Sequence, residues 1–254
     1  MTKAEEENLI ELIFFGLVDP YNLPENLYLG TGAVLTDAIY KALNITAEQI
    51  TYLQAEQKLF FESLKNNAYQ FSGAKTLNQV LELSSALLDE SGSVVSYKDF
   101  KSKANEILTT YNKNYLRTEY DHAFNTSQMS QKWNEAKDNK ELFPYLQYLT
   151  QGDLRVRKDH EALDLIIKKV DDKFWGTYYP PNGWNCRCNV LSLSTLEEEE
   201  TNLTELKLPE LDPMFEINYG EQKILFSPEH NYYVIANQFD KNLVESNFNL
   251  PPAP

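Results

Sequence analysis

The sequence predicts an α+β fold, with a helical N-terminal half followed by a small β-sheet and an irregular loop rich in aromatic residues and proline. Apolar residues recur at helical spacing through much of the first half of the chain. Residues 145–149 alternate in the way a half-buried strand does, and residues 188–193 form a second strand-like segment. Between them, residues 171–185 combine five aromatic side chains with two adjacent prolines, which deny backbone donors and stiffen a loop.

The N-terminal residues, 1–45, are predicted to form a helical arm. Leu9, Leu12 and Ile13 recur at helical spacing, and prolines 20 and 24 interrupt the pattern. A short helix is predicted over residues 33–43, at the end of this arm.

Three longer helices are predicted after the arm. The first covers residues 46–66, where Thr46 and Gln49 have the spacing of a capping box. The second covers residues 76–90. The third begins after Ser96 and either runs to residue 134 or breaks near residues 111–114.

The chain is therefore divided into an arm (1–45), a central domain (46–195) and a C-terminal extension (196–254). The acidic run Glu197–Glu200 is typical of solvated surface and is taken as the domain boundary. In the extension, a hairpin is predicted around Tyr219 and Gly220.

The net charge of −15, from 23 basic and 38 acidic residues, makes direct DNA binding by the isolated protein improbable. Such binding requires clustered Lys and Arg to neutralise phosphates. A membrane-spanning helix is not expected, because no run of about 18 apolar residues occurs. The acidic N-terminus is unlike a secretory signal, so synthesis in a cytoplasm without export is expected.

The two cysteines, Cys186 and Cys188, are too close in sequence for an unstrained disulfide. If they begin a strand, both sulfurs point one way and Arg187 points the other. Two thiolates could then share a zinc ion, with His160 as the soft ligand nearest in sequence. Structural zinc normally takes four such ligands, so the alternative is a pair of reduced thiols packed beneath Trp184.

A second candidate site combines Asp153, Arg155 and His160. These residue types could carry out general acid–base chemistry, as in a nuclease or transferase. They could equally form a hydrogen-bonded scaffold, which is favoured because no nucleophile or phosphate-binding loop accompanies them.

A third candidate is the charged pair Arg117 and Glu119 on the long helix, which could line a cleft or form a surface ion pair. The signatures of common ATPases, dehydrogenases, metalloproteases and serine hydrolases do not occur in the sequence. A non-enzymatic protein is therefore expected.

From about Phe60 to Ser194 the sequence resembles the phage Mu F-like head-morphogenesis family of minor head proteins. The resemblance rests on the order and spacing of several blocks, of which the last is the most specific: Arg117-Thr118-Glu119, Ala123, Trp133, Asp153-x-Arg155, His160, Leu163, Asp172, Phe174-Trp175, Tyr179-Pro180-Pro181 and Gly183-Trp184-Asn185-Cys186-Arg187-Cys188. By this resemblance, residues 46–195 would be the Mu F-like domain.

The resemblance implies a minor component of the virion of a tailed phage or prophage. Such a protein acts with the portal and capsid proteins during head assembly, and is carried inside the head. It could also take part in DNA packaging or ejection. No cofactor is expected, because Arg157, which cannot ligate a metal, stands where many broader relatives of this family have a cysteine; zinc stays an alternative at His160, Cys186 and Cys188.

Overall fold

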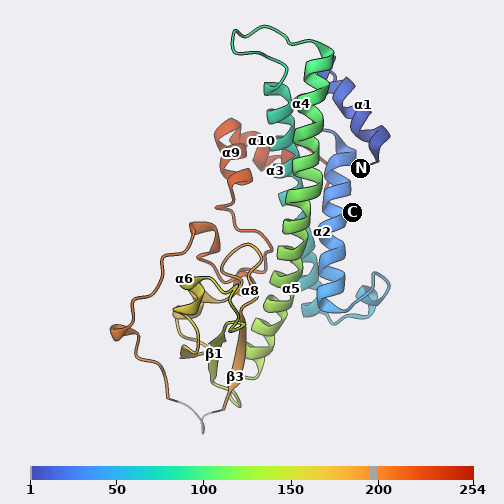
Figure 1. Ribbon diagram of the computed structural model, residues 1–254. Coiled ribbons are helices and arrows are strands. Elements are labelled where there is room, and N and C mark those ends of the chain that lie inside the picture. The colour runs from blue at the N-terminus through green and yellow to red at the C-terminus, as the bar shows by residue number, and fades with distance from the viewer. Residues whose placement is uncertain (1, 195–198) are drawn as a thin grey trace. The chain divides into compact units, whose positions relative to one another are not determined.

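The computed structural model describes residues 2–194 and 199–254 of the chain. Within those ranges, helices occupy most of the N-terminal half, and a three-stranded antiparallel sheet follows in the C-terminal half (Figure 1). The predicted α+β class is thus confirmed. The predicted domain boundary at residues 195 and 196, with the first half of the acidic run, lies outside the described residues.

The elements of the N-terminal half are mainly long helices: α1 (Lys3–Phe14), α2 (Glu25–Leu43), the 3₁₀ turn η1 (Gln49–Tyr52), α3 (Ala55–Ser85), α4 (Tyr97–Thr109), the π-helical segment η2 (Thr110–Tyr115) and α5 (Leu116–Asp138). The elements that follow are short: β1 (Tyr145–Leu149), α6 (Lys158–Glu161), β2 (Ile167–Lys169), α7 (Phe174–Tyr178), β3 (Asn189–Leu193), the 3₁₀ turns η3 (Leu203–Glu205) and η4 (Pro213–Phe215), α8 (Tyr219–Gln222), α9 (Asn231–Phe239), α10 (Lys241–Glu245) and the 3₁₀ turn η5 (Asn247–Asn249).

The chain divides into two compact units, each built from separate stretches of sequence. Unit 1 comprises Met1–Asp37, Lys65–Tyr120 and Pro228–Pro254. Unit 2 comprises Ala38–Leu64 and Asp121–Ser227.

In unit 1, the arm begins with α1, whose start is fixed by a capping box. The Thr2 hydroxyl accepts from the amide of Glu5, and the Glu5 carboxylate accepts from the amide of Thr2, so two amides are satisfied. The ring of Phe14, at the end of α1, packs against Tyr97 and Phe100 of α4. The arm is therefore held on α4 by aromatic contacts.

Helix α3 runs unbroken where two helices were predicted. The predicted start at residue 46 is also wrong, because α3 begins at Ala55. The predicted capping-box pair does form, since Thr46 and Gln49 exchange hydrogen bonds at the start of the short turn η1. In unit 1, the small residues of α3 admit neighbours: the Ser72 hydroxyl donates to the carbonyl of Tyr28, and the ring of Phe248 lies against Gly73. Residues that weaken the helical pattern in sequence are thus where other segments pack closely.

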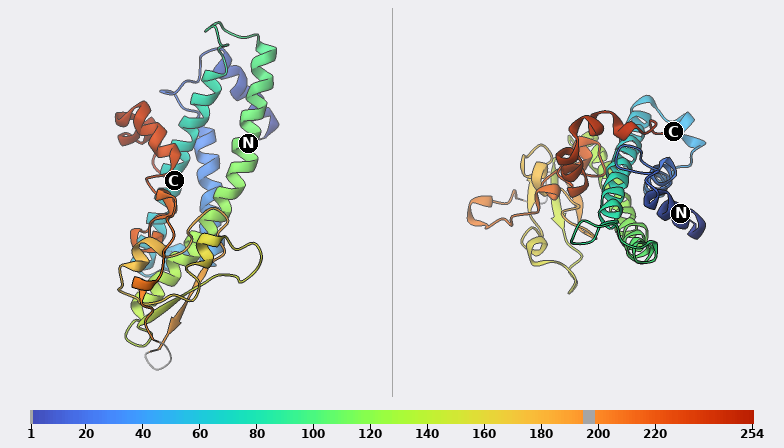
Figure 2. Two further views of the ribbon diagram at one scale, coloured as in Figure 1. Left: turned by 60° about the vertical axis from the view of Figure 1, so that its left-hand side comes forward. Right: turned by 90° about the horizontal axis from the view of Figure 1, so that it is seen from above.

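Of the two alternatives for the third helix, the chain stays helical from Tyr97 to Asp138, and the π-helical segment η2 lies where the break was predicted. Its carbonyl at Tyr111 accepts a hydrogen bond of 2.9 Å from the buried ammonium of Lys75 on α3. The C-terminal helices α9 and α10, drawn in red in Figure 2, also belong to unit 1. Asn78 of α3 donates to the carbonyl of Tyr232 in α9 at 2.9 Å, which joins these two helices.

In unit 2, the strands have the order β2-β1-β3, and both pairings are antiparallel. Strand β1 occupies the predicted residues, and Leu146 and Tyr148 are its buried positions. Strand β3 begins one residue later than predicted, at Asn189. Strand β2 was not predicted, since its three residues are too few to show alternation.

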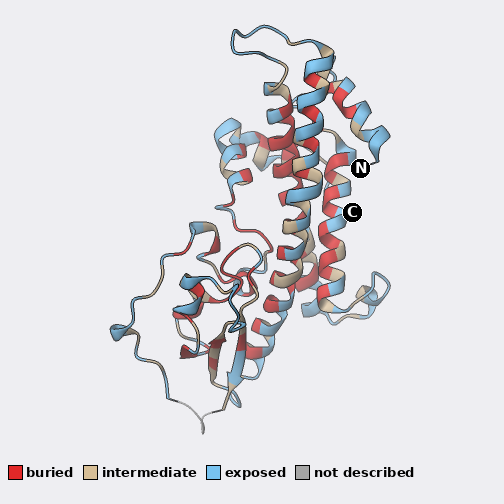
Figure 3. Cartoon of the chain, in the orientation of Figure 1, coloured by how far each residue is buried: buried red, intermediate tan, exposed pale blue. Residues whose placement is uncertain are grey.

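The sheet and α5 enclose the core of unit 2. Met129 and Trp133 of α5 pack with the buried residues of β1 and with Trp175 and Tyr179 of the aromatic loop. Figure 3 shows the buried faces of these elements. No helix in the described part of the chain is long and apolar enough to span a bilayer.

The hairpin predicted around Tyr219 and Gly220 is wrong. Residues Tyr219–Gln222 form the helical turn α8, because the Asn218 side chain accepts a hydrogen bond from the amide of Glu221. A Cβ at Gly220 would lie 2.7 Å from the Cβ of Trp133, so this glycine allows close packing on α5.

Candidate functional site

His160 and the two cysteines come from separate segments of unit 2. His160 lies on the single turn α6 and is buried. Cys186 and Cys188 lie in the segment that leads into β3, where Cys186 is buried and Cys188 is half-buried. The sheet brings the segments together, since β1 pairs with β3 and is followed in the chain by the loop to α6.

The loop before the cysteines takes a tight path that its residue types allow. A Cβ at Gly183 would lie 2.8 Å from the Arg157 guanidinium, so a larger residue would displace that side chain. Asn185 has a φ of 57°, in the left-handed region that Asn tolerates better than most residues. The amide of Cys186 then donates to the carbonyl of Gly183 at 3.1 Å, which closes the turn.

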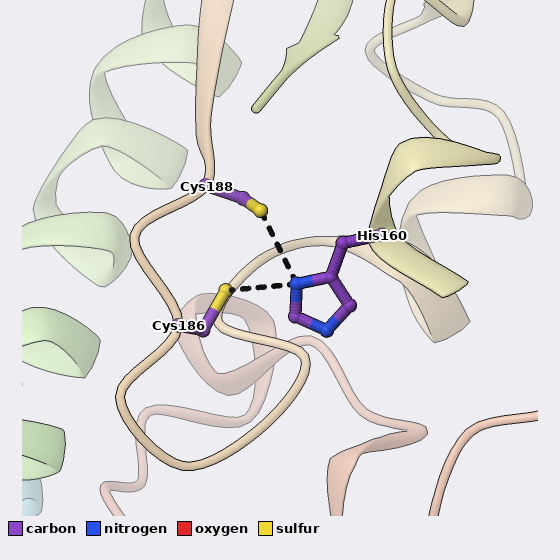
Figure 4. Close-up of side chains that lie close together, drawn as sticks. All are labelled: His160, Cys186 and Cys188. Carbon is purple, nitrogen blue, oxygen red and sulfur yellow. Dashed lines mark hydrogen bonds between the residues drawn. The ribbon is translucent and has the colours of Figure 1, made fainter. Parts of the chain in front are cut away.

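Both sulfur atoms face the same nitrogen of His160 (Figure 4). The Nδ1 atom lies 3.3 Å from Sγ of Cys188 and 3.7 Å from Sγ of Cys186. All three potential ligand atoms lie within 4.8 Å of one another. The three residues singled out from the sequence as candidate metal ligands thus form one cluster.

The other ring nitrogen of His160 is held by the backbone. Its Nε2 atom lies 3.2 Å from the carbonyl oxygen of Asn182. A carbonyl oxygen only accepts, so Nε2 must carry the proton. In the neutral imidazole this leaves a lone pair on Nδ1, directed at the two sulfurs. The Asn182 side chain accepts from the Tyr148 hydroxyl at 3.0 Å, which ties the same loop to β1.

Two arginines hold the cysteine loop from outside. Arg187 forms a bidentate ion pair with Asp153, with both hydrogen bonds at 2.7 Å. Its guanidinium therefore points to a different partner from the sulfurs, as the alternation predicted. Arg157 donates to the carbonyl of Trp184. These contacts fix the loop on both sides of Cys186.

A cavity of about 260 Å³ opens beside the cluster. Its lining combines the three clustered residues with polar and basic ones: Gln151, Arg155, Val156, Arg157, His160, Asn185, Cys186, Arg187 and Cys188. The cluster is thus reachable by a small polar or anionic molecule.

The thiols and the imidazole influence one another's protonation. The hydrogen bond from Cys188, together with His160, holds the pKa of Cys186 well below its usual range despite burial. The same contact, with burial, raises the pKa of Cys188 far above its usual range. Burial works against the charged form of His160, but Cys186 outweighs it and the pKa of His160 is raised. The pair of sulfurs therefore favours a state in which Cys188 keeps its proton and Cys186 is a thiolate.

Asp153 and Arg155, the other members of the proposed acid–base set, lie on the surface side of the cluster. Asp153 is engaged by Arg187, and this hydrogen bond holds the pKa of its carboxyl far below its usual range. Arg155 lies 3.7 Å from the same carboxylate and is largely exposed. The described hydrogen-bond partners of the His160 imidazole are instead Cys186, Cys188 and Asn182.

The remaining sequence candidates lie in different surroundings. Arg117 is exposed, whereas Glu119 is buried in unit 1 beside Lys75. Trp184 is half-buried and meets the ring of His122 edge to face at 4.9 Å between centroids. Asn185 is exposed at the left-handed turn.

Sequence reasoning missed two residues that shape the cluster. Asn182 orients the imidazole, and Asn125 of α5 donates to the carbonyl of Cys186 at 3.3 Å. Asn182 stands within the specific block that ends at Cys188, which could have indicated it. Asn125 lies 61 residues from its partner, so no local pattern could have done so.

Part of the chain is similar to a known protein family. The family described as "Phage Mu protein F like protein" matches residues 91–191. The "Putative capsid assembly protein F" of Escherichia phage Mu is 41% identical over 97 residues, which are 38% of this chain and 20% of that protein. The "Mu-like prophage FluMu F protein" of Haemophilus influenzae is 39% identical over 69 residues, which are 27% of this chain and 17% of that protein.

The matched segments therefore span at most about a fifth of these curated relatives. No solved structure matches the chain. The family match ends close to Ser194, as expected, but begins at residue 91 and not near Phe60. It includes α4, α5, β1 and the whole His160–Cys186–Cys188 cluster. Residues 91–191 of this chain are thus similar to the phage Mu F-like family, and this match covers less than half of the chain.

Proposed function

We propose that the chain is a structural, non-enzymatic component of a tailed-phage or prophage head, acting with the portal and capsid proteins in head assembly. The observation that carries this proposal is the similarity of its Mu F-like domain to a protein named for capsid assembly. In this proposal the protein is made in the cytoplasm of the bacterial host and becomes part of the virion, inside the head. A role in DNA packaging or ejection would follow from that location.

The N-terminal arm supplies a surface on which such an interaction can be tested. Three apolar side chains that follow α1 are 60–70% exposed: Phe15, Leu17 and Tyr21. Apolar side chains on an otherwise acidic arm suit contact with another protein more than contact with nucleic acid.

The test is deletion of the gene from the phage or prophage that carries it, followed by electron microscopy of particles, infectivity measurement and mass spectrometry of purified heads. The expected result is loss of infectious particles and presence of the protein in wild-type heads. Particles of normal composition and infectivity from the deletion strain would contradict the proposal.

A tagged protein should also co-purify with the portal protein from induced cells. Replacing Phe15 and Leu17 by Ser should reduce this recovery. Tyr52→Ser is the matched control, because Tyr52 is 87% exposed on η1 and outside the arm. Equal loss of recovery in the control would show that general surface changes, and not the arm, are responsible.

An enzymatic role around Asp153, Arg155 and His160 is the alternative. It is less well supported, because Asp153 is paired with Arg187 and His160 faces two sulfurs. His160→Ala should leave head assembly impaired only as far as folding is impaired, with no change in nuclease activity on single- or double-stranded DNA. A metal-independent nuclease activity lost in His160→Ala but retained in a folded Cys186→Ser variant would favour the enzyme.

A further inference from the structure

We propose that His160, Cys186 and Cys188 bind one Zn²⁺ ion through three protein ligands, leaving a fourth coordination position that opens into the adjacent cavity. The ligand atoms would be Nδ1 of His160 and the two Sγ atoms.

The spacing of the ligand atoms suits a tetrahedral ion. With Zn–S near 2.3 Å and Zn–N near 2.0–2.1 Å, tetrahedral angles place N and S about 3.6 Å apart. The observed distances from Nδ1 to the sulfurs are 3.3 and 3.7 Å. A zinc ion could therefore enter with small shifts of side chains, replacing hydrogen bonds by metal–ligand bonds.

The imidazole is already in the required tautomer. Because Nε2–H is directed at the carbonyl of Asn182, the lone pair of Nδ1 is free to bind a metal. A hydrogen bond from the non-ligating nitrogen of a histidine to a backbone carbonyl is a common support of metal sites, where it fixes the ring orientation. Two thiols that only pack in the protein interior would not require a hydrogen bond that fixes the tautomer of His160.

The loop that carries the cysteines is held in place without a metal. Arg187 is fixed by Asp153, the carbonyl of Trp184 by Arg157, and the carbonyl of Cys186 by Asn125. Little conformational entropy remains to be lost when the ligands close on an ion. Two thiolates and a neutral imidazole also balance the two charges of Zn²⁺, which matters in a largely buried site.

The fourth position distinguishes this site from a closed structural zinc site. Structural sites normally have four Cys or His ligands, whereas sites with three protein ligands keep a position for water or a substrate. All three proposed ligands line the cavity, together with Arg155 and Arg157. The open position therefore faces a polar, basic space, which suits water or a small anion.

Zinc uptake is measured first. Full-length protein is reduced, treated with a chelator, loaded with excess Zn²⁺, desalted, and examined by elemental analysis and native mass spectrometry. About one equivalent is expected in the wild type. Less than about a tenth is expected in the double variant Cys186→Ser/Cys188→Ser, because it keeps only one of the three proposed ligands. Less than a tenth of an equivalent in the wild type would overturn the proposal.

His160 is tested with a matched pair of histidine variants. His160→Asn should weaken zinc binding more than about tenfold, since even supporting residues cost that much. His230→Asn should bind zinc as the wild type does, because His230 lies in unit 1, where it caps α9, and Asn can also cap a helix. Equal affinities of the two variants, measured against a chromophoric chelator, would exclude His160 as a ligand.

Cobalt substitution tests the site in the wild type, so the result does not depend on whether the variants fold. Co²⁺ in the site should give thiolate charge-transfer bands and strong visible bands typical of four-coordination. Weak octahedral bands alone would overturn the proposal. Azide should then shift the visible bands by entering the open position, and an unchanged spectrum in excess azide would contradict the open fourth position.

Discussion

Lys75 and Glu119 form an ion pair inside unit 1, where their side chains are 1% and 4% exposed. Burial lowers the pKa of Lys75 and raises the pKa of Glu119, because both charged forms lose hydration there. The neighbours compensate: Lys75 also donates to the carbonyl of Tyr111, and Glu119 accepts from the hydroxyl of Tyr232. The pair therefore links α3, η2, α5 and α9 through polar contacts.

Removing one partner of this pair should strongly destabilise the protein. Lys75→Met leaves the Glu119 carboxylate buried without its cation, and the expected loss of unfolding free energy is about 3–5 kcal/mol. The double variant Lys75→Met/Glu119→Gln should lose less, since its amide keeps an acceptor for Tyr232 without a buried charge. The measurement is urea denaturation of the wild type, of the single variants Lys75→Met and Glu119→Gln, and of the double variant. A loss below about 1 kcal/mol in Lys75→Met would show that water reaches the pair.

The sequence predicts which residues form a site when a local pattern relates them. It does not predict the partner of a residue when that partner lies on another helix. Cys186 and Cys188 face the same side because alternate residues of an extended segment do so, and His160 is the histidine nearest to them in sequence. The partner of Glu119 is Lys75, which lies 44 residues away on another helix. Its identity depends on how the helices pack, which residue spacing does not reveal.

Among the elements, helix α2 contains two glycines that lie two residues apart and have different surroundings. A Cβ on Gly30 would have no heavy atom within 4 Å. A Cβ on Gly32 would lie 2.4 Å from the ring of Tyr69 on α3, which is itself buried. Close approach of α2 and α3 in unit 1 therefore depends on the missing side chain at Gly32.

The two alanine substitutions should have opposite effects on stability. Gly30→Ala should stabilise the protein by up to about 1 kcal/mol, because alanine favours a helix interior. Gly32→Ala should destabilise it by about 1–3 kcal/mol, because the overpacking against Tyr69 outweighs that preference. Thermal unfolding followed by circular dichroism measures both. A stabilising Gly32→Ala would mean that Tyr69 moves aside at little cost.

An ion-pair cluster in unit 2 should show a pH dependence that belongs to one carboxyl. Lys137 and Lys140 both pair with Asp171, and the hydrogen bond from Lys137 is the main cause that lowers the pKa of Asp171 to about 2. A depressed folded-state pKa gives stabilisation that is complete above the unfolded value of about 3.9 and is lost as pH falls through about 2.

Asp171→Asn should therefore lower the melting temperature at pH 7 by no more than a few degrees, since the side chain is largely exposed. The difference from the wild type should disappear near pH 2. Melting curves across this range test it, with Asp138→Asn as a control for removal of one acidic side chain. A difference that stays constant down to pH 2 would contradict the assigned pKa.

Element prediction worked best where one face of an element is buried. Strand β1 shows clean alternation and was predicted at its observed bounds. Helix α3 was predicted as two helices because Ser72 and Gly73 interrupt its apolar pattern, yet these small residues receive Tyr28 and Phe248. The hairpin prediction failed because Asn218 caps a helical turn, which a Tyr-Gly sequence does not reveal. Tertiary contacts explain both errors.

For the whole molecule, the net charge of −15 sets which partners it can hold unaided. At physiological salt, the isolated protein should bind random duplex DNA more weakly than about 10⁻⁴ M, the weak end of non-specific binding, because 23 basic residues are outnumbered by 38 acidic ones. Fluorescence anisotropy at several salt concentrations tests this. Micromolar binding with a steep salt dependence would reveal a basic surface that dominates the overall charge.

The way unit 1 is assembled from three stretches has a consequence for synthesis on the ribosome. Its final contacts include the Tyr28 hydroxyl donating to the carbonyl of Pro251 at 2.8 Å and the Phe248 ring on Gly73. Tyr28 must wait for a partner made more than two hundred positions later. Unit 2 includes no residue beyond Ser227, so its stretches can emerge and fold first. A stalled chain ending before Phe248 would leave the surface of α3 at Gly73 without the ring that covers it, and it would become a substrate for chaperones or proteases.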